Sequence, residues 1–429
     1  MEPILLVFII FAISLIIGLP IYISMLLSST MYFIVLGDIP FFVLAQKVFS
    51  SVDSFLLLAV PLFILAAKLM EHSGILNSLA DLCRALVGHI TGGLAHVTIT
   101  ASMFFAGITG CPLSDTAAIG SMLIPTMVRE KYGLDFSAAV TVAASIIGPI
   151  IPPSIAMILY AFVQGRISIK MLFLVGFIPG IIIGFGLMVV AYFISKKRNY
   201  PSYPRATLSE LWVSFKKSFL ALLAPVIILG GVFSGIFTAT ESAAVAVGYG
   251  LVTGVFITRK LSFKLIVDSL IDSAIISSIS LVVLGFASTL SYILTIEQIP
   301  SKATNIMMSI SDNPYIFLMM INFLLLFLGC FISALPLIII LTPILSPLAS
   351  SLGIDPIHFG LIVVMNLMIG QITPPVGGCL FVVTSICDTT VERVVKEVFP
   401  FFLLLFGVLI LVTYVPAISL TIPRIFGYS

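Results

Sequence analysis

The chain has 429 residues, of which 60% are hydrophobic and only 9% are charged, and its formal net charge is +2. Because soluble domains carry about 25% charged residues, this composition excludes a soluble globular protein and indicates a polytopic membrane protein. The small net charge, without a long basic run, argues against nucleic acid as a partner. The five cysteines show no CxxC spacing and the four histidines no HExxH motif, so no zinc site is predicted.

Ten stretches are apolar and long enough to cross a bilayer as helices, for which about 20 residues are needed. They fall near 3–18, 20–36, 55–71, 137–163, 169–195, 217–237, 240–258, 264–293, 358–386 and 398–421. Two amphipathic segments, 38–55 and 75–89, are expected to be interfacial helices or arms that brace a scaffold.

Two further apolar regions, 92–128 and 314–350, do not fit the pattern of a spanning helix. Gly107–Asp115 interrupts the first and Gly329–Pro336 interrupts the second. The remaining arms have about 15 residues each, enough to reach the middle of the bilayer and return but too few to cross comfortably. We therefore predict one re-entrant hairpin in each region.

Basic residues in the loops predict the orientation, because cytoplasmic loops are enriched in lysine and arginine. The loop 196–217 contains six basic residues and one acidic residue, Glu210, and is placed in the cytoplasm. Counting spans from this loop, hairpin 92–128 opens to the cytoplasm and hairpin 314–350 opens to the outside. The two hairpins are thus expected to enter the membrane from opposite faces.

An internal repeat relates the two halves of the chain. The residues of the first copy that recur in the second, at offsets of 218 to 222 positions, are Pro125, Gly133, Asp135, Gly148, Pro152 and Pro153. Each half then holds five spans and one hairpin, and because five is odd the second half is inverted. Inverted repeats with broken helices are typical of secondary transporters, whose binding site lies near the bilayer midplane.

Helix breaks are predicted at the two hairpin tips, at Gly148–Ser154 and at Gly370–Gly378. In hydrocarbon an unpaired N–H or C=O costs several kcal/mol, so such backbone persists only where protein or water satisfies it. Prolines release carbonyls one turn earlier, and carbonyl and hydroxyl oxygens suit a hard cation. We therefore predict two symmetry-related cation sites, formed by Gly107, Thr109, Ser145, Gly148, Gly329, Ser333, Gly370 and Thr373.

Helix N-termini at the same breaks favour an anion, so the substrate site is expected beside Thr109, Ser114, Asp115 and Ser154. Asp115 lies in an apolar arm, where a carboxylate is a functional candidate. The alternative is that Ser114 or Asp115 caps a helix, and the small residues at the breaks could equally mark close helix packing. Glu241 is interpreted as a first-turn structural residue behind Thr238 or Thr240.

Four segments resemble the large membrane subunit of tripartite ATP-independent periplasmic (TRAP) transporters. They read FFAGITGCPLSDTAAIGSMLIP (104–125), GPIIPPS (148–154), TATESAAVAV (238–247) and GIDPIHFGLIVVMNLMIGQITPPVGGCLFV (353–382). The resemblance implies an elevator-type transporter that couples uptake of an organic acid across the bacterial inner membrane to Na⁺. It also implies two protein partners, a soluble periplasmic substrate-binding protein and a small four-helix membrane subunit.

The resemblance favours sialic acid as the substrate, with a C4-dicarboxylate or another carboxylate as the alternative. It implies scaffold segments at 1–91 and 217–313, transport segments at 92–195 and 314–429, and a cytoplasmic loop at 196–216. The family pattern is broken at the first tip, which reads Thr109-Gly110-Cys111, and at Ser333, where the family carries an aspartate. The second cation site therefore depends on carbonyl oxygens.

Two other classes of protein are weighed against a transporter. An ion channel would need a continuous polar lining, whereas the polar residues here gather at two midplane points. An enzyme would show an HExxH zinc motif, paired carboxylates or a Ser/His arrangement. The sequence shows none of these, so no enzymatic activity is expected.

Overall fold

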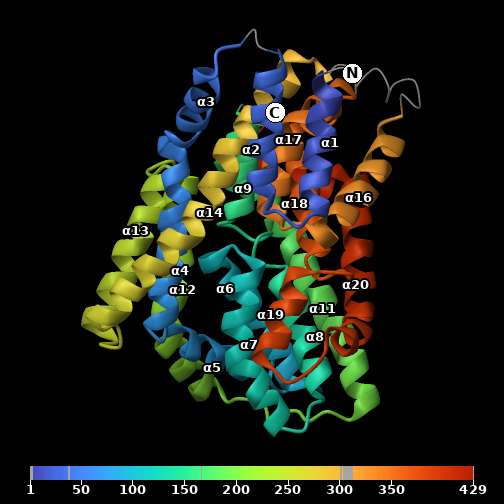
Figure 1. Ribbon diagram of the computed structural model, residues 1–429. Coiled ribbons are helices and arrows are strands. Elements are labelled where there is room, and N and C mark those ends of the chain that lie inside the picture. Colours follow the sequence, from blue (N-terminus) through green and yellow to red (C-terminus); the bar gives the residue numbers. More distant parts are fainter. Residues whose placement is uncertain (1–2, 37–38, 166, 300–301, 303–312, 429) are drawn as a thin grey trace.

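The computed structural model describes residues 3–36, 39–165, 167–299, 302 and 313–428 (Figure 1). All regular secondary structure in this part of the chain is helical. Eight of the helical segments described there are long and apolar enough to cross a membrane. The fold is the predicted all-α polytopic membrane protein.

The helices of the two halves are as follows. The first half contains α1 (Pro3–Ile16), α2 (Ile21–Leu36), α3 (Phe42–Val52), η1 (Phe55–Leu58), α4 (Ala59–His72), α5 (Ile75–Val87), α6 (Gly93–Thr109), α7 (Pro112–Arg129), α8 (Leu134–Ser145), α9 (Ile155–Gln164), α10 (Ile169–Val175) and α11 (Phe177–Arg198). The second half contains α12 (Leu208–Ser234), α13 (Ala239–Val252), η2 (Thr253–Ile257), α14 (Phe263–Ile296), α16 (Pro314–Phe331), α17 (Ala334–Ser351), α18 (Pro356–Gly370), α19 (Gly378–Ile386), α20 (Val391–Tyr414) and α21 (Pro416–Ile425).

Both halves follow one order: three helices, a hairpin of two helices, a broken helix and a last span. In the first half these are α1, α2 and α4, then α6–α7, α8–α9 and α11; in the second they are α12, α13 and α14, then α16–α17, α18–α19 and α20. The predicted spans 3–18 and 20–36 are helices of only 14 and 16 residues, α1 and α2, and are not among the eight segments long enough to cross. In Figure 1, α8 lies low and α9 high, whereas α18 lies high and α19 low. The two copies are therefore inverted, as predicted.

The hairpins turn more tightly than the sequence suggested. The first turns at Gly110–Cys111 and the second at Ile332–Ser333, so the wider interruptions predicted at each tip are wrong. The arms are also longer than the expected length of about 15 residues, with 17 in α6 and 18 in each of α7, α16 and α17. The first turn is short because Gly110 adopts a left-handed conformation, with φ at 59°.

Two other expectations change in detail. The last predicted span, 398–421, is two helices, because α20 ends at Tyr414 and Pro416, which has no N–H, starts α21. The basic connection between the halves is helical at both ends, so only residues 199–207 lack helical structure. The predicted amphipathic segments are helices, as α3 and α5.

Capping boxes start two helices of the second half. The Thr238 hydroxyl accepts from the Glu241 N–H at 3.2 Å, and the Thr238 N–H donates to the Glu241 carboxylate at 2.8 Å. Thr207 and Glu210 repeat this arrangement at the start of α12. The structural interpretation of Glu241 is confirmed, because its carboxylate satisfies a helix end that would otherwise be unpaired.

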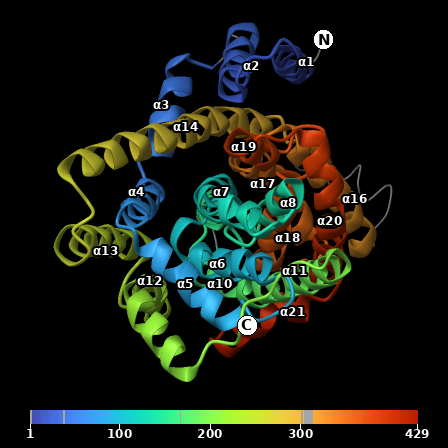
Figure 2. The same cartoon turned by 90° about the horizontal axis from the view of Figure 1, so that it is seen from below.

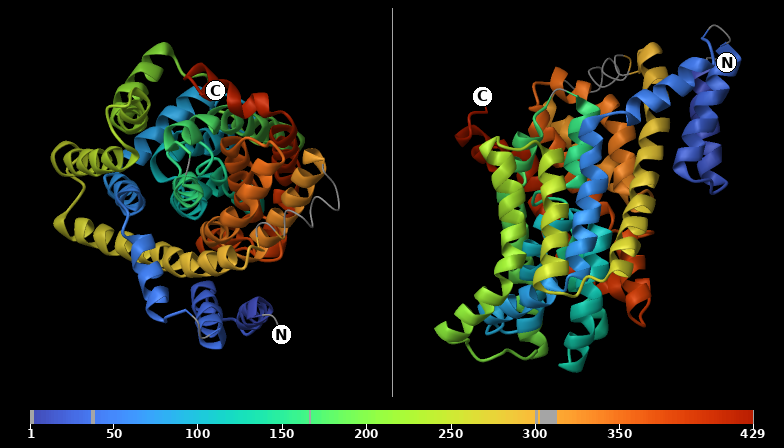
Figure 3. Two further views of the ribbon diagram at one scale, coloured as in Figure 1. Left: turned by 90° about the horizontal axis from the view of Figure 1, so that it is seen from above. Right: turned by 90° about the vertical axis from the view of Figure 1, so that its left-hand side faces the viewer.

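Helices α4, α12, α13 and α14 lie on one side of the molecule, around the hairpins and broken helices (Figure 2). α13 packs on α4, α12 packs on α5, and α14 contacts α2, α3, α4 and α17. Figure 3 shows α1 and α2 at the edge, outside α14. With 34 residues, α14 is about 51 Å long, more than the thickness of a bilayer core. It is therefore long enough to cross the membrane even when tilted, and it packs against the second hairpin through α17.

Candidate substrate and cation site

The two hairpin tips line one cavity of about 200 Å³, named here the tip cavity. The first tip contributes Gly110, Cys111, Pro112 and Leu113, and the second contributes Ser333, Ala334, Leu335 and Pro336. α14 contributes Ile276, Ile279, Ser280 and Val283, and the remaining lining residues are Ile155, Ile339, Met368 and Gln371. The hairpins thus meet inside the molecule, as the inverted repeat predicted, and they meet against α14.

Three helix N-termini converge on the tip cavity. α7 begins at Pro112, α9 at Ile155 and α17 at Ala334, and all three residues line the cavity. A helix N-terminus carries unpaired N–H groups and a partial positive charge, which together favour an anion. The cavity can therefore accept a carboxylate at one side, while its isoleucine and leucine side chains contact an apolar part of the same ligand.

The first tip sits directly on the first broken helix. A Cβ at Gly110 would lie 2.6 Å from the carbonyl oxygen of Pro153 and 3.1 Å from the Cα of Ser154, so no larger residue fits there. Ser154 is fully buried, and its hydroxyl accepts from the N–H of Met157 at 3.2 Å as the cap of α9. Ser154 thus starts the helix whose first residue, Ile155, lines the cavity, but none of the four predicted substrate residues, Thr109, Ser114, Asp115 and Ser154, lines it directly.

Asp115 is fully buried behind the first tip. The Thr109 hydroxyl donates a hydrogen bond to its Oδ1, whereas Oδ2 has no hydrogen-bond partner among the described residues. A Cβ at Gly148 would lie 1.9 Å from Oδ2, so this oxygen points at the backbone of the first break. A buried carboxylate oxygen without a donor is costly, and a bound cation would remove that cost.

The alternative that Ser114 or Asp115 caps α7 is wrong. The cap position is Cys111, and no side chain accepts a hydrogen bond there. Asp115 is the fourth residue of α7, and its own N–H donates to the Cys111 carbonyl at 3.1 Å. Ser114 lies half-buried beside it. The carboxylate is thus turned away from the helix end and toward the break.

The first break supplies oxygen atoms near Asp115. Pro149, Pro152 and Pro153 have no N–H, so no α-helical hydrogen bond can reach the carbonyls of Ser145, Gly148 and Pro149 from those positions. The Ser145 hydroxyl donates to the Val142 carbonyl at 2.8 Å, which leaves its lone pairs available. The structure therefore brings Thr109, Ser145 and Gly148 together around Asp115.

Gly107 lies inside α6 rather than in an irregular tip. It is in the last turn, where carbonyl groups lack helical partners. A Cβ on Gly107 would lie 2.9 Å from the Pro225 side chain, so α6 and α12 approach closely here. The predicted role as a carbonyl ligand stays a prediction, and the structure adds a packing reason for glycine at this position.

The second tip is tied to the second break by backbone contact. A Cβ at Gly370 would lie 2.7 Å from the Cα of Gly329, and the Gly377 N–H donates to the Cys330 carbonyl at 3.1 Å. The predicted partners Gly329 and Gly370 are therefore brought together. Thr373 lies within the break, and its hydroxyl donates to the Ile369 carbonyl at 2.8 Å. Ser333 is exposed and starts α17 without capping it.

Gln371 is the residue that the site prediction left out. Its Nε2 donates to the carbonyls of Gly329 at 3.4 Å and Ile332 at 3.3 Å, and it is 3% exposed. The amide thus occupies carbonyls that the sequence suggested were free for a cation. The signal was its place beside the Pro374-Pro375 pair, where a buried polar side chain needs a partner.

The two sites therefore differ in charge. The first contains the carboxylate of Asp115, whereas the second is formed by glycine, threonine, serine and glutamine. The described residues include no group of three or more histidine, cysteine, aspartate or glutamate side chains that could hold a metal. Any cation held here would be bound by hydroxyl and carbonyl oxygens with one carboxylate, which suits a hard ion rather than zinc.

Comparison with known proteins identifies the family. The family model described as the DctM component of the tripartite ATP-independent periplasmic transporter matches residues 8–418. The chain is 41% identical over 414 residues to the sialic acid TRAP transporter large permease protein SiaM of Vibrio cholerae, with 96% of each chain covered. It is 39% identical over 386 residues to the C4-dicarboxylate TRAP transporter large permease protein DctM of Pseudomonas aeruginosa, with 90% of each covered.

A third relative is the 2,3-diketo-L-gulonate TRAP transporter large permease protein YiaN of Escherichia coli, 36% identical over 93% of this chain and 94% of that one. Among solved structures, the YdaH transporter of Alcanivorax borkumensis aligns with a TM-score of 0.65 over 87% of each chain, at 14% identity. That match shows a shared fold alone. The family model and the relatives above 30% identity cover nearly the whole chain, and this protein belongs to the DctM family of TRAP transporter large permeases.

Proposed function

We propose that this permease takes up a small organic acid across the bacterial inner membrane by coupling it to Na⁺. The observation that carries the proposal is the pairing of the tip cavity with the unpartnered Asp115 carboxylate oxygen behind it. The cavity presents helix N-termini to an anion, while the break presents oxygen atoms to a cation. The anion and the cation then both bind to the first hairpin and the first broken helix. Binding to shared elements is the physical requirement for coupling the two ligands.

The first cation site fits Na⁺ as a transported ion. Asp115, Thr109 and Ser145 offer side-chain oxygens, and Gly107 and Gly148 offer backbone carbonyls that helical bonding leaves free. Three of these residues, Gly107, Thr109 and Asp115, lie on the hairpin, and Ser145 and Gly148 lie at the break. Binding Na⁺ would therefore draw the tip against the break and order the wall of the tip cavity.

The second cation site is proposed at Gly329, Ser333, Gly370 and Thr373. It has no formal negative charge, so a cation there must take the carbonyls that Gln371 now holds. This exchange makes the second site weaker than the first, because a neutral oxygen set gains less electrostatic energy than a carboxylate.

The substrate carboxylate is proposed to bind in the tip cavity. The predicted residues Thr109, Ser114, Asp115 and Ser154 lie behind the lining, and three of them precede or follow the lining residues Gly110, Leu113 and Ile155 in the chain. The negative charge of Asp115 would repel the substrate carboxylate unless a bound Na⁺ neutralises Asp115 first. Na⁺ is therefore proposed to bind before the substrate. Sialic acid is the favoured substrate and a C4-dicarboxylate the alternative, since relatives similar to this chain carry both names. The mixed lining of apolar side chains and few polar groups suits either.

Transport is proposed to follow an elevator mechanism. The hairpins and broken helices move as one body along α14, while α4, α12 and α13 stay in place with it. The long uninterrupted α14 and the tip cavity at its surface support this division. A small four-helix membrane subunit and a soluble periplasmic binding protein are the proposed partners, the second delivering the substrate.

The test is uptake by proteoliposomes that contain this permease with its membrane partner, supplied with a loaded binding protein. An inward Na⁺ gradient should drive accumulation, and equimolar K⁺ should abolish it. If two Na⁺ accompany one monoanion, each cycle moves one net charge, worth about 2.3 kcal/mol per 100 mV. Accumulation that persists without a Na⁺ gradient would overturn the proposed coupling.

A further inference from the structure

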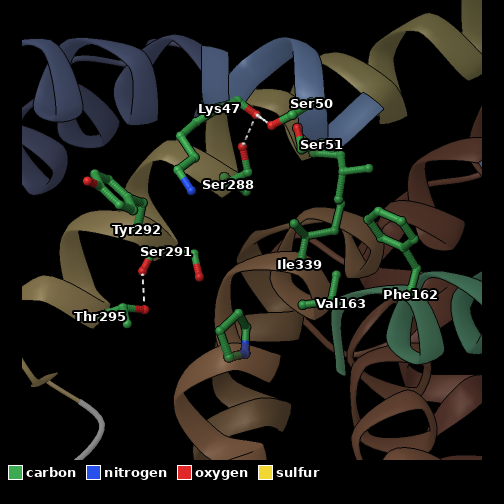
Figure 4. A pocket seen from close by; sticks show the side chains of 13 residues that line it. Lys47, Ser50, Ser51, Phe162, Val163, Ser288, Ser291, Tyr292, Thr295 and Ile339 are labelled. Atoms are coloured by element: carbon green, nitrogen blue, oxygen red, sulfur yellow. Dashed lines mark hydrogen bonds between the residues drawn. The ribbon is translucent and has the colours of Figure 1, made fainter. Parts of the chain in front are cut away.

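A second cavity, of about 420 Å³, lies between α3, α9, α14 and α17 (Figure 4). We name it the outer pocket and define it by Lys47, Ser288, Ser291, Tyr292, Thr295 and Ile339, which all line it. It lies toward the Ile296 end of α14. The opposite end of this helix follows Arg259 and Lys260 and is cytoplasmic by the distribution of basic residues, so the outer pocket faces the periplasmic side.

The outer pocket continues the tip cavity. Ile339 of α17 lines both, and the lining of α14 passes without a gap from residues 276–283 at the tip cavity to residues 284–295 at the outer pocket. The two cavities are thus successive parts of one interface between α14 and the hairpins. A ligand that leaves the outer pocket along this interface reaches the hairpin tips.

The outer pocket carries a single charge, and it is positive. Lys47 is the only ionisable residue of its lining apart from Tyr292, and no carboxylate lines it. The Lys47 ammonium lies 4.5 Å from the centre of the Tyr292 ring and forms no salt bridge within the described residues. One unpaired cation in a half-enclosed pocket attracts anions, because low-dielectric walls concentrate its field.

The hydrogen-bond donors of the outer pocket indicate that its ligand is an oxyanion. The hydroxyls of Ser288 and Thr295 already donate to backbone carbonyls, at 2.7 Å and 2.8 Å. In the described part of the chain the hydroxyls of Ser291 and Tyr292 donate to no group, and neither does the Lys47 ammonium. The Lys47 ammonium and the Ser291 hydroxyl therefore remain for a ligand, and a carboxylate accepts from both readily, whereas the Tyr292 hydroxyl points away from them (Figure 4).

Lys47 is held in place from its backbone. The Ser288 hydroxyl also approaches the Lys47 carbonyl at 3.0 Å, and the Ser50 hydroxyl donates to the same carbonyl at 3.3 Å (Figure 4). The Ser288 contact joins α14 to α3 at the residue that carries the charge, whereas the Ser50 contact lies within α3. The backbone of Lys47 is thereby held by two packed helices rather than by a free loop.

We propose that the outer pocket is a binding site for the carboxylate of the transported organic acid, occupied before the substrate reaches the tip cavity. Lys47 neutralises the carboxylate, Ser291 donates a hydrogen bond to it, and the Tyr292 ring packs against the Lys47 ammonium. This assignment rests on the proposed function, because the ligand named here is the proposed transport substrate. A lipid phosphate is also an oxyanion, and the experiment below distinguishes the substrate carboxylate from a lipid phosphate.

The experiment uses Thr295→Cys as a probe in the full chain, with the five native cysteines replaced and the protein in phosphatidylcholine vesicles. Thr295 lines the outer pocket, and its hydroxyl is not among the free donors. The measurement is the ratio of modification rates by an anionic and a cationic methanethiosulfonate reagent. Lys47→Gln should lower this ratio by about threefold to fivefold, the upper part of the range for an exposed charge pair, and Lys47→Arg should preserve it.

The matched control is Lys264→Gln, an exposed lysine near the other end of α14, which should leave the ratio unchanged. N-acetylneuraminate or succinate should slow modification of Thr295→Cys when Lys47 is present and not in Lys47→Gln. An unchanged ratio in Lys47→Gln, or no protection by either acid, would overturn the proposal. Protection only by added phosphatidylglycerol would also overturn it, in favour of a lipid site.

This measurement needs no transport and no Na⁺ gradient. Uptake could prove independent of Na⁺ while the reagent ratio and the protection behave as expected. The proposed Na⁺ coupling would then be wrong, and the proposal that the outer pocket binds the substrate carboxylate would be supported. In transport assays, Lys47→Gln should raise the apparent KM for the substrate about threefold to fivefold without changing the maximal rate. A fall in maximal rate alone would point to a structural role of α3 instead.

Discussion

The free carboxylate oxygen of Asp115 points at Gly148, so closely that a Cβ there would lie 1.9 Å from it. This contact joins the first hairpin to the first broken helix at the level where the helix has lost its regular hydrogen bonds. Any side chain at position 148 would push the carboxylate away from the break. The two residues therefore form a single unit, in which glycine provides the space that the carboxylate occupies.

Asp115→Asn should weaken Na⁺ dependence more than tenfold. The change keeps the shape of the side chain and its contact with Thr109 but removes the charge. Interactions with a charged group contribute about 1.5–3 kcal/mol, which corresponds to more than a tenfold change in affinity. The measurement is the Na⁺ concentration for half-maximal uptake. Asp388→Asn, at an exposed carboxylate, is the control, and equal Na⁺ affinities in both variants would remove Asp115 from the cation site.

Gly370→Ala should reduce uptake at least tenfold. The added methyl would lie 2.7 Å from the Cα of Gly329, so the second hairpin must move away from α18. Gly407→Ala in α20 is the matched control, because nothing lies within 4 Å of its added Cβ. The assay is initial uptake rate per molecule of correctly inserted protein. Similar activity of the two variants would show that the contact between tip and break is dispensable.

Thr373→Val should weaken Na⁺ dependence about fivefold, less than Asp115→Asn. The valine keeps the shape of the side chain and removes the hydroxyl, a neutral group whose interaction contributes about 1 kcal/mol. The readout is again the half-maximal Na⁺ concentration, with Thr384→Val, whose hydroxyl is bonded to the Phe381 carbonyl of α19, as control. A larger effect than that of Asp115→Asn would reverse the proposed ranking of the two sites.

A cross-link between α14 and α17 should block transport. Ile279 and Ile339 both line the tip cavity, one on each side of the proposed sliding interface. Ile279→Cys and Ile339→Cys joined by a short reducible cross-linker should lower uptake at least tenfold, and reduction should restore it. The control joins Leu69→Cys to Gly250→Cys, whose Cβ atoms would lie 3.2 Å apart within the scaffold. Full uptake by the cross-linked α14–α17 pair would exclude the elevator motion.

The repeat made much of the fold predictable. Pro152-Pro153 and Pro374-Pro375 indicated both broken helices, because proline cannot donate a helical hydrogen bond in any context. The hairpins were predicted from the interruptions in two apolar regions and the short arms that remained, but their turns were placed too broadly. A glycine inside an apolar arm reads the same whether it turns the chain, as Gly110 does, or lets another helix approach, as Gly107 does beside Pro225. Only the neighbouring helix distinguishes these two uses.

The sequence predicted which residues belong to the site better than it predicted the role of each residue. Thr109, Ser145 and Gly148 were expected together and lie around Asp115, but that carboxylate was assigned to the substrate or to a helix cap. Gln371 was left out of the site, although its amide bridges two carbonyls of the second hairpin. Side-chain direction decides such roles, and direction depends on packing between segments that are distant in the chain.

By itself, the sequence determined that the chain is a membrane protein of two inverted copies with four interrupted helices. These properties follow from local physics, namely the length of apolar runs, the missing N–H of proline and the distribution of basic residues. The tertiary structure alone decided that the cavity between the tips lies against α14 and that one Asp115 oxygen is left without a donor. Such outcomes depend on which surfaces come into contact, and no single segment encodes them.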